Sequence, residues 1–456
     1  SKACRRTPWS DLRVIEGLDP GARSLANPAA KRPSLPLVRA APLADIVAVV
    51  ASVGLILTYV GFWSAPLTGY GARSADFLRN FYYPAYLLAL ILVCLRPERA
   101  LKGLIRSPLL IALLLLTAAT YFWSIMPELT ARRIPALAFT TLAGVALASR
   151  WSWRSLTEII AGTLAVLAIL SFLVGALLPQ MGRMDEIFPG AWRGLWLEKN
   201  SMGNVMVKTT VFLLAAGVMA PERRKLWFGL AVVPVLLILL STSKTALVVL
   251  VLSLASMGFV AVVKSGPLRA VVATWLAVVF VIGAGLLIAM ETDTFFALLG
   301  KDATLTGRTE IWSGIMQQMA EHPWKGFGYG AVWDDPSFTG PKAWIGYQAH
   351  FMPADAHSGW LELYIALGLG GVILFALFLT QIWAQSLWAA YTSPGGWLAL
   401  PLIASFTVTM LTESIAMNWH ELRWVIVVAL ALKLALGDEP TAPSRPRLKR
   451  NATGPV

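Results

Sequence analysis

Hydrophobic residues in this chain fall in blocks of about 17 to 25 residues, separated by short charged or Pro- and Gly-containing breaks. A helix of that length crosses the hydrocarbon core of a bilayer. We therefore predict an all-α polytopic membrane protein. The expected transmembrane helices, about twelve in number, cover Leu43–Trp63, Phe81–Leu95, Pro108–Trp123, Ile134–Ser149, Thr157–Leu178, Val205–Ala220, Leu226–Leu240, Thr245–Val263, Ala270–Met290, His357–Trp383, Trp397–Leu411 and Trp424–Leu436.

Composition supports the membrane prediction. The 456 residues are 57% hydrophobic and 14% charged, whereas a soluble protein carries about a quarter of its residues as charges. The first apolar block begins only near Leu43, behind a Pro-, Arg- and Lys-rich stretch, so we expect no cleaved signal. Cys4 and Cys94 both fall on the predicted cytoplasmic face, where we expect no disulfide.

The distribution of Lys and Arg predicts the orientation. These residues gather in both tails and in 96–106, 150–154, 223–225 and 264–269, which places both termini in the cytoplasm. An even number of spans agrees with that orientation. The net charge of +13 then reflects topology and attraction to anionic lipids. Nucleic-acid binding is not expected, because no basic domain with interleaved aromatic residues is present.

Three regions follow from this pattern. We expect residues 1–42 and 437–456 to be disordered cytoplasmic tails that flank a transmembrane domain, 43–436. Two long loops, 179–204 and 291–356, face the outside. The second lies between spans nine and ten and is rich in aromatic residues, so we expect it to be folded. Within it, Ile311, Ile315 and Met319 recur every four residues, which indicates a short amphipathic helix at the membrane surface.

His357 stands where the longest polar loop meets a predicted span, with Asp355 before it and Glu362 after it. One interpretation is a structural histidine at a helix start. The other is a histidine that exchanges protons, because ionisable groups at membrane depth are often functional. His350 lies seven residues upstream, but no third residue has the spacing of a metal ligand, so we predict no metal site.

Four cations stand near the predicted outer ends of helices. Arg193 and Lys199 precede the sixth span, Arg308 opens the amphipathic segment, and Lys244 precedes the eighth span. Helix starts favour anions, and guanidinium groups chelate phosphate with paired N–H bonds, so this set suits a diphosphate. Three of these cations also have a structural alternative. Arg193 could anchor the chain at the membrane interface, and Arg308 could form an ion pair with Glu310. Lys244 could simply extend its ammonium group into the aqueous phase.

Three elements resemble the O-antigen ligase and polymerase family of bacterial inner membranes. His357-Ser358, nine residues and Gly368 are similar to the family's His-[Asn/Ser/Gln]-x9-Gly pattern. Arg193-x3-Leu197 is similar to its Arg-x3-Leu element. Segments 307–312 and 322–330 look like parts of its large periplasmic loop.

The resemblance implies an inverting glycosyltransferase that takes glycan from undecaprenyl diphosphate on the periplasmic face of the inner membrane. His357 would accept the proton of the acceptor hydroxyl, and Arg193, Arg308 and Lys199 would bind the diphosphate. Supporting roles would fall to Glu362, Asn200 and Lys244. Cationic side chains and a base meet the needs of this reaction, so neither a metal nor another cofactor is expected.

Two activities occur within that family, and they differ in the acceptor. A polymerase extends the chain onto the next lipid-linked repeat, whereas a ligase moves finished polymer onto lipid A-core. The Lys199-Asn200 pair resembles exopolysaccharide polymerases and slightly favours the first activity, although Glu198 replaces the histidine expected before it. A transporter or flippase of lipid-linked glycans is the alternative of another class. Few charges lie within the predicted spans, which argues against that alternative.

Overall fold

The computed structural model describes residues 43–68, 76–185, 188–290 and 307–438. The chain divides into two units, residues 1–42 and 43–456. The first unit, which is the predicted basic tail, lies outside the described residues. Residues 439–456 of the C-terminal tail and parts of the two predicted outside loops, 186–187 and 291–306, lie outside them as well.

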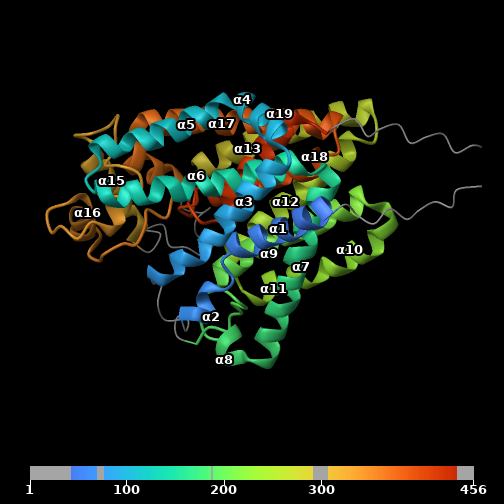
Figure 1. The fold of residues 1–456 in the computed structure, drawn as a ribbon, viewed down its shortest axis with the longest axis horizontal. Helices are drawn as coiled ribbons and strands as arrows, with labels where there is room; N and C mark the ends of the chain where they lie inside the picture. The colour runs from blue at the N-terminus through green and yellow to red at the C-terminus, as the bar shows by residue number, and fades with distance from the viewer. Residues whose placement is uncertain (1–42, 69–75, 186–187, 291–306, 439–456) are drawn as a thin grey trace, which may run out of the picture. The chain divides into compact units, whose positions relative to one another are not determined.

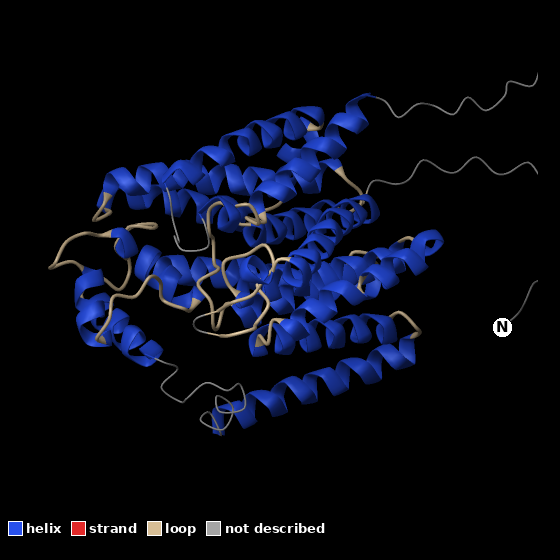
Figure 2. Cartoon of the chain, turned by 90° about the horizontal axis from the view of Figure 1, so that it is seen from below, coloured by secondary structure: helices blue, strands red, loops and turns tan. Residues whose placement is uncertain are grey.

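The described residues of the second unit are helical and contain no β-strand, as Figure 1 and Figure 2 show. Each predicted span coincides with a helix, except that the seventh is divided between α10 and α11. These helices are α1 (Leu43–Tyr59), α3 (Tyr83–Leu95), α5 (Pro108–Ala119), α6 (Pro127–Arg150), α7 (Trp153–Leu177), α9 (Lys199–Met219), α10 (Arg224–Leu230), α11 (Val232–Leu240), α12 (Lys244–Val263), α13 (Pro267–Met290), α17 (Gly359–Thr392), α18 (Gly396–Thr409) and α19 (Leu422–Leu436).

Shorter helical segments connect these helices. They are α2 (Ser64–Thr68), η1 (Asp76–Tyr82), α4 (Pro97–Ile105), η2 (Thr120–Trp123), α8 (Pro179–Gly182), η3 (Pro221–Arg223), α15 (Arg308–Met319), η5 (Val332–Asp334) and α16 (Pro341–Ala349).

The number of membrane crossings stays a prediction. Among the described residues, five helical stretches are long and apolar enough to cross a bilayer: Phe77–Leu95, Trp153–Leu177, Lys199–Met219, Lys244–Val263 and Gly359–Thr392. A pair bent by 84°, Pro97–Ile105 with Pro108–Trp123, would make a sixth. Several of the other predicted spans are shorter: α19, for example, has 15 residues, fewer than the roughly 20 that span the hydrocarbon core.

Close packing between α6 and α19 places the start of α19. Gly144 of α6 lies against Val425 and Val428, so the two helices approach without an intervening side chain. Trp424 is fully buried and its indole N–H donates to the Thr141 hydroxyl at 2.9 Å. This contact holds the first turn of α19, where the segment between α18 and α19 ends.

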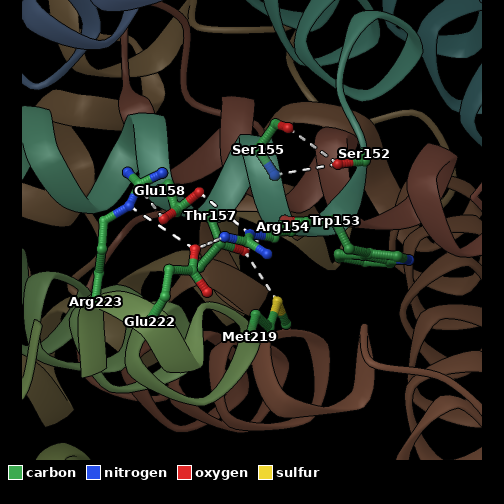
Figure 3. A network of polar contacts seen from close by, with 9 residues as sticks. All are labelled: Ser152, Trp153, Arg154, Ser155, Thr157, Glu158, Met219, Glu222 and Arg223. Atoms are coloured by element: carbon green, nitrogen blue, oxygen red, sulfur yellow. Dashed lines mark hydrogen bonds and ion pairs between the residues drawn. The ribbon is translucent and has the colours of Figure 1, made fainter. Parts of the chain in front are cut away.

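Figure 3 shows a polar network where α7 begins. Arg154 pairs with Glu222, and Glu158 lies 3.3 Å from the Arg223 guanidinium. The Ser152 hydroxyl accepts the Ser155 N–H at 3.1 Å and so caps α7. The network ties α7 to η3. Each of these partly exposed ion pairs contributes about 1 kcal/mol or less.

The predicted amphipathic helix is confirmed as α15, but its apolar face does not lie on the membrane. Ile311, Ile315 and Met319 are all fully buried, in a cluster with Ile345 of α16 and Ile365 of α17. Figure 1 shows α15 and α16 side by side. The apolar face is therefore covered by neighbouring helices of the protein, a contact that local periodicity cannot reveal.

Candidate active site

The segment 322–330 docks on α17 at a break in that helix. Gly368 has φ 68° and ψ −172°, a conformation that is almost restricted to glycine. The break changes the hydrogen bonding of the helix backbone. The Ile365 carbonyl accepts the Phe327 N–H at 2.9 Å, and Leu369 donates its N–H to the Pro323 carbonyl at 2.7 Å. The spacing from Ser358 to Gly368 thus fixes where the loop docks on the helix.

His357 lies two residues before α17, which begins at Gly359. The prediction that His357 opens the helix is therefore wrong. A local turn replaces the first helical residues: the His357 backbone N–H donates to Asp355 Oδ1 at 2.7 Å, with φ 47° at His357. This left-handed backbone is uncommon outside glycine and marks a conformation held by its surroundings.

The same carboxylate oxygen orients the imidazole. His357 Nδ1 lies 3.2 Å from Asp355 Oδ1, and the Ser414 hydroxyl donates to that oxygen at 3.1 Å. The ring is 37% exposed. An Nδ1–H that donates to Asp355 leaves Nε2 with its lone pair available to accept a proton.

Glu362 binds the backbone of the residue that precedes His357. Its Oε2 accepts the Ala356 N–H at 3.2 Å, and its Oε1 accepts the Trp333 indole N–H at 2.6 Å. The Ala356 carbonyl in turn accepts the Trp312 indole N–H at 2.9 Å. Two helices and the 3-10 segment η5 therefore hold the residue that precedes His357.

Arg308 is the first residue of α15, and its guanidinium donates to the Thr412 carbonyl at 2.9 Å. Thr412 stands two residues before Ser414, the partner of Asp355. Arg308 and the Asp355–His357 pair are thus anchored on one segment, 410–421, which connects α18 and α19. The predicted phosphate-binding arginine and the predicted proton acceptor are therefore held by the same segment.

Arg193 and the remaining predicted residues form a second cluster. The Arg193 guanidinium donates to the carbonyls of Met181 at 2.9 Å and Gln180 at 3.2 Å, at the end of α8. In the first turn of α9, Lys199 Nζ lies 3.4 Å from the Thr242 hydroxyl, and Asn200 Oδ1 accepts the Ser243 hydroxyl at 2.8 Å. Lys244 is exposed at the start of α12.

Two adjoining cavities border the elements that carry these clusters. One, of about 350 Å³, is lined by residues that include Asp355, Glu362 and Ser414. The other, of about 320 Å³, is lined in part by Trp196 and Leu197, which follow Arg193. Both cavities share Trp419 and Glu421. They therefore meet at the segment 410–421.

Sequence reasoning assigned no role to His420, although it borders the second cavity. Its Nε2 lies 2.5 Å from the Tyr86 hydroxyl, and its ring stacks on Tyr82 with centroids 3.7 Å apart. Burial lowers the pKa of His420 to about 4, so the ring is neutral at neutral pH. These partners lie more than 300 residues apart in the chain, and no spacing could have indicated them.

Arg133 was also missed as a site residue. It pairs with Asp334, donates to the Gly330 carbonyl and lies 4.4 Å from the ring centroid of Trp419. It therefore joins α6, the 322–334 region and the segment 410–421 at the edge of the first cavity.

Two comparisons with known proteins give matches for this chain. Residues 229–376 match the family model described as O-antigen ligase. That range contains Arg308, His357 and Gly368, whereas Arg193 precedes it. The chain is also 28% identical over 323 residues to the exopolysaccharide production protein ExoQ of Rhizobium meliloti (strain 1021). The aligned region covers 68% of this chain and 71% of that protein.

The Gly368 break can be tested with Gly368→Ala. A Cβ there collides with the backbone of Trp324, so we expect a loss of about 1–3 kcal/mol in the free energy of docking of the 322–330 segment. Hydrogen–deuterium exchange should show faster exchange of the Phe327 and Gly328 amides. Gly370→Ala is the control, because its Cβ would meet only the Trp324 carbonyl oxygen at 3.6 Å. Unchanged exchange in Gly368→Ala would contradict the assignment.

Proposed function

We propose that this chain, whose residues 229–376 match the O-antigen ligase family model, is a glycosyltransferase that uses undecaprenyl-diphosphate-linked glycan as donor. It moves an oligo- or polysaccharide to the hydroxyl of an acceptor sugar, on the periplasmic face of the bacterial inner membrane. The observation that carries the proposal is the Asp355–His357 pair, anchored on the same segment as Arg308.

The proposed reaction needs one base. The proton of the acceptor hydroxyl passes to His357 Nε2 as the hydroxyl oxygen bonds to the anomeric carbon of the donor. The bond from that carbon to the diphosphate breaks, and the diphosphate leaves with the electron pair. Attack opposite the leaving group inverts the anomeric centre. Asp355 holds the ring and stabilises the imidazolium that forms.

Arg308 compensates the charge that develops on the leaving diphosphate. A guanidinium has five N–H donors, so the bond to Thr412 leaves donors for phosphate oxygens. Arg193 and Lys199 supply further positive charge from the second cluster. These cations take the role that a metal ion has in other transferases, so neither a metal nor another cofactor enters the proposed reaction.

Polymerase activity is slightly favoured over ligase activity. The similar protein from Rhizobium meliloti is named for exopolysaccharide production, and Lys199-Asn200 opens α9 here. The acceptor would then be the next lipid-linked repeat. Transfer to lipid A-core is the alternative, and transport of lipid-linked glycan is the alternative of another class.

Incubation of the purified protein with undecaprenyl-diphosphate glycan, with and without lipid A-core, tests the function. We expect a ladder of longer glycans without lipid A-core, and no product from His357→Ala because the base is lost. His350→Asn is the control, since His350 is exposed and Asn tolerates its left-handed backbone. One shifted lipid A-core product would indicate a ligase. Absence of any covalent product from the wild type would favour a transporter, and normal product from His357→Ala would reject the base assignment.

Asp355→Asn separates orientation of the base from substrate binding. The variant keeps an oxygen beside Nδ1 but loses the negative charge, so we expect kcat to fall about 10- to 100-fold. KM for both substrates should change little. Ser414→Ala removes only one bond to Asp355 and should lower kcat less. A rise in KM at constant kcat would contradict a positioning role for Asp355.

Arg308→Ala and Arg308→Lys test the diphosphate contact. We expect Arg308→Ala to reduce kcat/KM for the donor about 100-fold or more. Arg308→Lys should recover only part of it, because an ammonium lacks the paired N–H geometry. Circular dichroism and detergent size-exclusion profiles serve as folding controls. Full activity in Arg308→Ala would exclude the contact.

A further inference from the structure

The cavity of about 320 Å³ lies among α1, the 196–208 region and the start of α19. Its volume is within the roughly 300 to 1,000 Å³ of small-molecule sites. Trp419 and Glu421 line both this cavity and the cavity that Asp355 lines, so the two cavities are neighbours. A group held here therefore lies next to the cavity that carries the proposed base's partner.

Lys208 brings an amino group into this cavity from within α9. Its Nζ donates to the Asn204 carbonyl at 2.9 Å, and within the described residues it makes no ion pair. Arg423 differs, because two of its N–H groups bind Glu421 at 2.7 and 2.6 Å and the pair is neutral as a unit. A buried, unpaired ammonium costs several kcal/mol, and charges within membrane helices are usually kept for a function.

The walls around Lys208 suit a sugar ring. Trp196, Tyr59 and the stacked Tyr82 and His420 rings supply aromatic surface. Ser201 and Asn204 of α9 line the same cavity and bring polar groups for hydroxyls. His420 is neutral and Arg423 is paired with Glu421, so among the described residues Lys208 is the cationic group of this lining without a carboxylate bound to it.

We propose that this cavity binds one sugar of the glycan that carries a carboxylate, with Lys208 as its counter-ion. The charge balance favours a carboxylate over the diphosphate, because a diphosphate carries at least two negative charges and one ammonium compensates only one. This inference rests on the proposed function and specifies its substrate as an acidic glycan.

Transfer assays with two donors test the inference. One is an undecaprenyl-diphosphate repeat that contains glucuronate, and the other is its carboxyl-reduced counterpart. We expect the wild type to prefer the acidic donor about 10- to 100-fold in kcat/KM, the effect of one charged hydrogen bond. Lys208→Met should lose that preference and keep its rate with the neutral donor, whereas Lys208→Arg should retain much of the preference.

Lys264→Met is the matched control, because Lys264 binds the Ser393 carbonyl outside this cavity. It should keep the wild-type preference. A Lys208→Met variant that still prefers the acidic donor overturns the proposal. Equal loss with both donors also overturns it and assigns Lys208 to the diphosphate or to folding.

Calorimetric titration separates this site from the proposed reaction. Free glucuronate-containing oligosaccharide should bind the wild type more tightly than its carboxyl-reduced form, and Lys208→Met should remove the difference. That result without transfer to any acceptor would retain the acidic-sugar site and reject the glycosyltransferase function. Binding of neither oligosaccharide, or equal binding of both, overturns the site.

Discussion

The arrangement of the site depends on the hydrogen bonding of the α17 backbone at Gly368. A helix in an apolar environment must satisfy its own backbone groups, and any carbonyl it releases needs another donor. Here the released carbonyls accept N–H groups from the segment 322–330, which is thereby fixed to the helix that follows His357. The loop and the helix that follows His357 are therefore parts of one hydrogen-bonded structure.

The sequence predicted the helices well, because long apolar blocks leave few alternatives. It was less accurate where side chains compete with the backbone. At His357 the Asp355 carboxylate stabilises a turn, and the helix begins two residues later. The apolar face of α15 was predicted, but the elements that bury it were not. Helices α16 and α17 pack on that face only in the tertiary fold.

Site residues were predictable to the extent that a motif carried them. Arg308 and His357 were predicted in this way, and in the structure both are anchored on the segment 410–421. Arg193 instead binds the end of α8. Ser414 and His420 belong to no motif: they contact residues that are distant in the chain, and such contacts leave no regular spacing.

Two contacts of α15 have a geometric consequence. The helix begins with Arg308, and one turn later Trp312 binds the Ala356 carbonyl, next to His357. One helix therefore contacts both the segment 410–421, through Arg308, and the residue that precedes His357, through Trp312. A shift of α15 would strain both contacts at once, so the position of this helix is coupled to the backbone on either side of His357.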